Sequence, residues 1–230
     1  MSVAESLARL EQQRDALVRA ALDHIAFDGW SMMSLKAAAV DLGLAPEEVD
    51  RLLPGGVRQA IEHYVAMTDR EMVAHLETLN LPDMKIRERI ATAVRERLKL
   101  VEGHKDAVRA AVAWLALPQN LALSAKLTAR TVDLMWVAAG DTATDYNRYT
   151  KRALLAGVYG STLLYWLDDT SDDHRDTMAF LDRRIANVMK IPKIQAQIGK
   201  ITERVSRLGG KAASCVPSPL RVFRQFGSPR

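Results

Sequence analysis

Cysteine is almost absent from this chain of 230 residues, in which Cys215 is the one example. A single thiol cannot form an internal disulfide, so nothing points to an oxidising compartment. Long apolar runs are missing too, because no stretch approaches the roughly 18 residues that a membrane-spanning helix needs. The N-terminal segment is charged throughout, unlike a secretory signal peptide. Together these absences predict a cytoplasmic protein.

The usual motifs of catalysis are also missing. The sequence contains no E-x-x-H, no G-x-S-x-G, no C-x-x-C and no glycine-rich phosphate loop. Glu71 and His75 lie four positions apart, a spacing typical of a surface pair on one helix. The stretch "DDTSDDH" at 168–174 lacks the glycine turn and terminal Glu of a calcium loop. We therefore expect no metal, no cofactor and no enzymatic activity.

Charge is distributed unevenly along the chain. Residues 190–230 carry nine Lys and Arg against one acid, Glu203, whereas the other residues carry 23 basic side chains against 27 acidic ones. The net charge of +4 and the pI of 9.3 therefore come from the C-terminal segment. A basic tail on an acidic body predicts contact with an anionic surface at the C-terminus alone.

Helix-forming residues dominate the composition, so the expected fold class is all-α. Caps and breakers divide the chain into a head (1–56), a body (57–190), an amphipathic helix (191–210) and a flexible basic tail (211–230). Helices are expected at 4–27, 34–42, 46–53, 57–79, 83–102, 104–117, 119–139, 145–167 and 173–190, before a terminal helix that begins at Pro192.

Residues 34–53 place two short helices around "LGLAP", which resembles a helix-turn-helix. A three-helix head on a larger helical body resembles the TetR-type repressors, and one hypothesis is therefore a transcriptional regulator that senses a lipid. The recognition helix argues against it, because Glu47, Glu48 and Asp50 accompany a single base, Arg51. Acidic side chains repel the phosphates whose neutralisation dominates DNA affinity. We expect no binding of nucleic acid through this helix.

The C-terminal segment contains a narrow apolar stripe with helical spacing, whose central members are Ile194, Ile198, Ile201 and Val205. Four bases line the stripe: Lys193, Lys200, Arg204 and Arg207. Apolar burial together with attraction to anionic lipid favours a membrane surface. A helix that packs on its own body or forms a homodimer is the alternative, although fewer than three heptads make a short coiled coil.

The segment 132–162, "VDLMWVAAGDTATDYNRYTKRALLAGVYGST", places aromatic residues and Met135 on both sides of a polar hinge. One interpretation is that these side chains fill the core and that Asp145 caps the next helix. The other is that some of them form an exposed docking patch, since Met and aromatic residues are favoured at interfaces. Spacing alone favours the core.

This segment resembles the signature of the accessory proteins of ubiquinone (coenzyme Q) biosynthesis. The matching positions are Asp133, Met135, Trp136, Ala139, Gly140, Asp141, Thr144, Asp145, Asn147, Tyr149, Thr150, Arg152, Leu155, Ala156, Tyr159 and Thr162. "HIAFDGW" at 24–30 and "LALPQN" at 115–120 are also similar to the family.

The resemblance implies a TetR-like fold that has lost DNA recognition, and a non-catalytic protein. It implies an apolar pocket for isoprenoid quinone intermediates, which are presented to a ring hydroxylase at a membrane. The docking patch for that hydroxylase corresponds to Asp133, Met135, Tyr149 and Arg152. Arg148 replaces an exposed Trp of well-known members, so the partner surface differs here. The expected location is the cytoplasm, peripheral on the inner face of the cell membrane. A structural protein that scaffolds biosynthetic enzymes is a third hypothesis.

Overall fold

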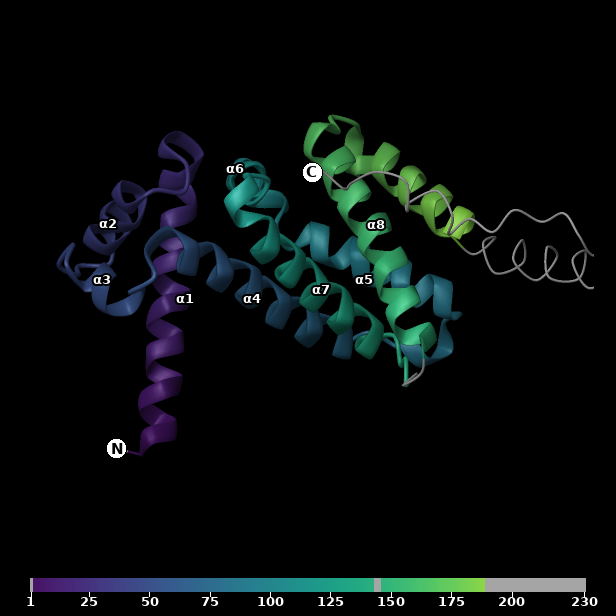
Figure 1. The fold of residues 1–230 in the computed structure, drawn as a ribbon, viewed down its shortest axis with the longest axis horizontal. Coiled ribbons are helices and arrows are strands. Elements are labelled where there is room, and N and C mark those ends of the chain that lie inside the picture. Colours follow the sequence, from purple (N-terminus) through teal and green to yellow (C-terminus); the bar gives the residue numbers. More distant parts are fainter. Residues whose placement is uncertain (1, 143–145, 189–230) are drawn as a thin grey trace, which may run out of the picture. The chain divides into compact units, whose positions relative to one another are not determined.

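The computed structural model describes residues 2–142 and 146–188 of the chain (Figure 1). All regular elements in these two ranges are helices, which confirms the all-α fold class. The chain divides after Ile185 into two units, and helices α1 to α8 (3–168) and the contacts that follow belong to the first, Met1–Ile185. In the described ranges, no helix has the length and apolarity to cross a membrane.

Three helices form the head: α1 (Val3–Asp28), α2 (Met32–Asp41) and α3 (Glu48–Leu52). A capping box starts α1, because the Ser2 hydroxyl accepts from the amide of Glu5 at 3.2 Å and the Glu5 carboxylate accepts from the Ser2 amide at 2.8 Å. Gly29, at φ 65°, ends it in a conformation that a side chain would strain. The second helix, expected to begin at Ser34, begins two residues earlier, because the Ser31 hydroxyl accepts a hydrogen bond from the Ser34 amide at 3.1 Å and caps it.

The body contains α4 (Gly56–Glu77), α5 (Ile86–Lys99), α6 (Lys105–Leu115), α7 (Leu121–Ala138) and α8 (Tyr146–Asp168), followed by a helix at 175–188. Described helix ends lie within three residues of those expected from caps and breakers. Packing joins α4 to α5 and α7, and joins α7 to α8 (Figure 1). The apolar stripes of these helices supply the core, which includes Met72, Leu98, Met135 and Trp166.

Trp30 connects the head to the body within this unit. Its indole nitrogen donates to the carbonyl of Ala107 at 2.9 Å, and its ring lies 5.4 Å from the ring of Tyr64, centroid to centroid. The side chain is buried, so its N–H needs this internal acceptor. α1 accordingly packs against both α4 and α6.

Candidate functional site

A cavity of about 390 Å³ lies among helices α4 to α8. Most of its wall is apolar, as in Val65, Val101, Val108, Val112, Leu127 and Leu163. α8 contributes Gly160 to the wall, and a Cβ at this position would meet no heavy atom within 4 Å, so there is open space beside this glycine. This volume falls in the range of about 300–1,000 Å³ that is typical of small-molecule sites.

One part of the wall is polar and consists of Tyr64, Arg97, Thr131 and Tyr159. Behind it lies Asp69, whose side chain is fully buried. Arg97 donates from Nε to Oδ1 of Asp69 at 3.2 Å, and the Thr131 hydroxyl lies 3.0 and 3.1 Å from the two carboxylate oxygens. Two charges are therefore held inside a helical bundle as a hydrogen-bonded pair, which is the condition under which buried charges are tolerated.

Burial controls the protonation of these groups. Loss of solvent raises the pKa of Tyr64 to about 12 and also raises the pKa of Tyr159, although Arg97 opposes both shifts. Burial likewise raises the pKa of Asp69 from its ordinary value, against the effects of Arg97 and Thr131. Both phenols are therefore protonated at neutral pH and able to donate hydrogen bonds.

A second cluster lies on the surface of α7 and α8. Asp133 accepts hydrogen bonds from Nη2 of Arg148, at 3.2 Å, and from Nε of Arg152. Arg152 also reaches Oδ2 of Asp141 from Nη1 at 3.2 Å, and Lys151 reaches Oδ1 of Asp141 at 2.8 Å. Three of the residues predicted for docking, together with Asp141 and Lys151, thus meet at one place on the body.

The aromatic and sulfur-containing members of the predicted patch separate in the structure. Tyr149 is 71% exposed, whereas Met135 is fully buried and belongs to the core. The expectation that Met135 lies on the docking surface is therefore wrong for this structure. Met135 lies on the inward face of α7, two residues after the surface-facing Asp133. Trp136 is half-buried, and its indole nitrogen donates to the carbonyl of Lys151 at 3.3 Å.

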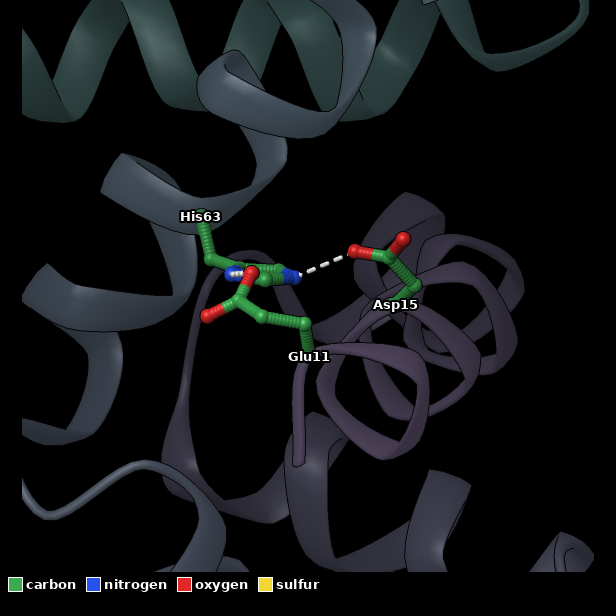
Figure 2. Close-up of side chains that lie close together, drawn as sticks. All are labelled: Glu11, Asp15 and His63. Atoms are coloured by element: carbon green, nitrogen blue, oxygen red, sulfur yellow. Dashed lines mark hydrogen bonds and ion pairs between the residues drawn. The ribbon is translucent and has the colours of Figure 1, made fainter. Parts of the chain in front are cut away.

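A third cluster joins α1 to α4 through Glu11, Asp15 and His63 (Figure 2). His63 Nε2 lies 2.6 Å from Asp15 Oδ1, and its Nδ1 lies 3.9 Å from Glu11. Within the part of the chain that the structure describes, these three offer ligand atoms within 4.8 Å of one another. Arg70 already contacts Asp15 at 2.6 Å and Glu11 at 3.8 Å. The Arg70 guanidinium thus places a positive charge beside both carboxylates. The cluster is an ion-pair network between α1 and α4.

Comparisons with known proteins identify the family. The COQ9 family model matches residues 121–192, which include α7 and α8. The ubiquinone biosynthesis protein COQ9-B, mitochondrial, of Xenopus laevis is 32% identical over 202 residues, covering 85% of this chain and 69% of the relative. The chain belongs to the COQ9 family. The rat COQ9 protein is 32% identical over 195 residues, and the human protein is 30% identical over the same length. Those matches cover 82% of this chain, which spans 62% of the rat relative and 61% of the human one.

A solved structure agrees with the expected fold. The crystal structure of a TetR transcriptional regulator from Nitrosomonas europaea superimposes with a TM-score of 0.64, covering 77% of this chain and 98% of that chain. The sequences are 21% identical, so this similarity concerns the fold alone. The expected resemblance to the ubiquinone accessory proteins and the TetR-like fold are both confirmed.

The predicted cellular location is wrong. The rat, cattle and Xenopus relatives are named as mitochondrial proteins, which conflicts with the cytoplasm and with the inner face of the cell membrane. The prediction failed because low cysteine content and a charged N-terminal segment only argue against secretion. They do not distinguish the cytoplasm from a compartment inside an organelle.

The predicted membrane-binding residues cannot be placed. Every one of them, from Lys193 to Arg207, lies outside the described residues, as does the expected cap Asp145. The membrane interpretation and its homodimer alternative stay predictions.

The polar wall of the cavity was missed by sequence reasoning, because Asp69 stands within "TDRE" and Arg97 within "RERLK". Such charged stretches resemble an ordinary solvated helix face.

Proposed function

We propose that this chain is a non-catalytic lipid-binding protein of ubiquinone biosynthesis. It holds an isoprenoid quinone intermediate in the cavity among α4 to α8 and presents it, at a membrane, to a ring hydroxylase. The observation that carries this proposal is the apolar cavity in a chain of the COQ9 family, whose named relatives are ubiquinone biosynthesis proteins.

The physical advantage of such a carrier comes from the hydrophobic effect. Exposing an isoprenoid tail to water costs about 0.8 kcal/mol for each CH₂ group. Valine and leucine side chains in the cavity wall offer a lipid chain an environment similar to the bilayer interior. A lipid that stays buried between membrane and enzyme avoids most of that cost.

The surface cluster on α7 and α8 is proposed as the docking site for the hydroxylase. Exposed Tyr149 supplies the apolar contact, and Arg148, Arg152 and Asp133 supply charged and hydrogen-bonding groups. Tyr and Arg are the residue types that dominate the binding energy of interfaces. Arg148 is already bonded to Asp133, so this surface favours a partner whose charge complements that pair.

The C-terminal stripe is proposed as the contact with the membrane. Its isoleucines supply apolar burial, and each flanking base adds about 1 kcal/mol of attraction near anionic lipid. This proposal rests on the sequence pattern of residues 191–208.

A lipid-sensing transcriptional regulator is the second hypothesis, and the TetR-like fold favours it. The chemistry of α3 opposes it. Arg51, the one base of the recognition helix, pairs with Glu48 at 2.7 Å, and Glu47 and Asp50 add uncompensated negative charge. A helix with this charge meets DNA phosphates with repulsion.

Lipid extraction from the purified protein, followed by mass spectrometry, tests the proposal. Gly160→Leu places a side chain in the cavity without an initial clash, so it should abolish co-purification of the isoprenoid lipid. Gly157→Leu is the matched control, because Gly157 is exposed on the same helix and a Cβ there also meets nothing within 4 Å. Co-purification that survives Gly160→Leu unchanged would show that the lipid is not held in this cavity.

A further inference from the structure

The hydroxyl of Tyr64 lacks a hydrogen-bond partner among the residues that the structure describes. The side chain is 4% exposed, and its Oη is buried. Because an unsatisfied buried hydroxyl costs about 1–3 kcal/mol, a native fold keeps one only where something else satisfies it. Tyr64 lines the cavity, so a ligand held there can supply the missing partner.

Arg97 presents further donors to the same region. Among the described residues, Arg97 donates a hydrogen bond from Nε to Asp69. Its two terminal nitrogens therefore remain available to a ligand. Its charge is balanced by that carboxylate. Arg130 also lies 4.0 Å from Asp69, but its side chain is half exposed and is not part of the cavity wall. The polar wall is therefore rich in donors but carries little net charge at the cavity itself.

We propose that Tyr64 and Arg97 form a hydrogen-bonding subsite for an uncharged acceptor oxygen, such as a carbonyl or ether oxygen, on the head of an otherwise apolar ligand. The inference rests on the proposed function, since it assigns the orientation of a lipid within the same cavity. The head lies against α4 and α5, and the chain runs along the apolar walls of α6, α7 and α8.

The charge balance decides between an uncharged head and an anionic one. A carboxylate or phosphate needs a net positive charge to offset its desolvation, and the Asp69 carboxylate cancels most of what Arg97 offers. A ketone or ether oxygen needs donors only. Ser124 and Thr128 also line the cavity, but both belong to α7 and are half-buried, whereas the Tyr64 hydroxyl is the donor with an unmet requirement.

Tyr64→Phe isolates this interaction, because it removes one oxygen that has no partner in the protein. Two probes differ in the same way: 4-octylacetophenone carries a ketone oxygen, and 1-ethyl-4-octylbenzene has the same carbon skeleton without it. Neither reacts with the thiol of Cys215. Binding is measured by displacement of a fluorescent fatty-chain probe from the full-length protein. Tyr165→Phe, a tyrosine outside the cavity wall, is the matched control.

We expect Tyr64→Phe to weaken binding of the ketone about three- to tenfold, the typical worth of one neutral hydrogen bond, and to leave binding of the hydrocarbon unchanged. Tyr165→Phe should alter neither. An equal loss for both probes would mean that Tyr64 acts through shape, and no loss for either would mean that water satisfies its hydroxyl. Both outcomes would overturn the subsite but leave the lipid-binding cavity standing.

A third probe, dodecanoate, separates the charge classes. The assignment to an uncharged oxygen requires that Tyr64→Phe affects the ketone more strongly than the carboxylate. The reverse order would overturn it in favour of an anion site. If the wild-type protein binds none of the three probes, the subsite and the proposed lipid-binding function both fail.

Discussion

Arg97 donates a hydrogen bond from its Nε to Oδ1 of Asp69, and both side chains are buried in the helical body. The two residues come from α5 and α4, so the pair fastens these helices beside the cavity. The Tyr64 hydroxyl, which lacks a partner among the described residues, belongs to the wall of the same cavity.

Arg97→Met should destabilise the fold by about 3–5 kcal/mol, because it leaves the Asp69 carboxylate buried without its partner. The double variant Arg97→Met/Asp69→Leu should recover much of this loss, since well-packed apolar residues often replace a buried pair at little cost. Chemical denaturation measures both. A single variant as stable as the wild type would contradict the buried-pair geometry.

Tyr64→Phe should change how stability responds to alkaline pH. The folded state holds the Tyr64 proton up to a pKa of about 12, whereas the unfolded state releases it near 10.0. The contribution of this proton to the free energy of unfolding is therefore complete below pH 10 and is lost as pH rises from 10 to 12. Between pH 9 and 11 the free energy of unfolding, measured with urea, should fall by about 1 kcal/mol more for the wild type than for Tyr64→Phe. Tyr165→Phe should follow the wild type, and parallel curves for wild type and Tyr64→Phe would contradict the prediction.

Tyr149→Ala should weaken capture of the ring hydroxylase about tenfold, the scale of an interface hot spot, and leave thermal stability unchanged because the side chain is exposed. Phe27→Ala removes another exposed aromatic ring, from α1 in the head, and should have no effect on capture. A pull-down or surface plasmon resonance assay makes the comparison. Equal effects of the two changes would remove the basis for a site on α7 and α8.

Arg152→Ala removes hydrogen bonds to both Asp133 and Asp141, so its effect on stability needs a separate measurement. Lys151 remains bonded to Asp141 and Arg148 remains bonded to Asp133 in this variant, so neither carboxylate loses its last partner and the fold should survive. We expect weaker capture of the hydroxylase with a melting temperature close to that of the wild type. Unchanged capture in a folded Arg152→Ala protein would exclude Arg152 from the docking surface.

The C-terminal stripe predicts two separable contributions to liposome binding. Replacing Lys193, Lys200, Arg204 and Arg207 by Gln should remove the preference for anionic over neutral vesicles, which salt screens over about 8 Å. Replacing Ile194, Ile198 and Ile201 by Ser should weaken binding to both kinds of vesicle, because salt barely affects apolar burial. Full binding by the Ser variant together with lower thermal stability or less dimer would identify the stripe as a packing face.

Duplex DNA should bind weakly, and any binding should come from the basic C-terminal segment 190–230. The same four Gln substitutions should weaken it, because they remove four of the nine bases of this segment, whereas Arg51→Ala in α3 should leave it unchanged. Electrophoretic mobility shift at low and physiological salt provides the measurement. Binding that depends on Arg51 but not on the tail would revive the regulator hypothesis.

Local residue patterns were enough to predict the helices. The breaks at Gly29 and Pro118 and at the polar connectors depend on the few residues around them, because breaking a helix is a local effect. The acidic character of the recognition helix is equally visible in the sequence, and the structure adds that Glu48 neutralises Arg51. The family resemblance was readable from one ungapped segment because its residues are consecutive along α7 and α8 and the hinge between them.

What faces inward was decided by the tertiary structure. Met135 and Asp133 are two positions apart, yet one lies in the core and the other takes part in an ion network with α8, because positions two apart point to nearly opposite sides of a helix. Asp69 and Arg97 look like solvated charges in their own segments and become a buried pair only when α4 and α5 meet. The all-helical fold, the family and the positive charge of residues 190–230 could all be predicted from the sequence alone. The cavity and the unsatisfied Tyr64 hydroxyl exist only where five helices converge, because burial and hydrogen-bond partners depend on residues distant along the chain.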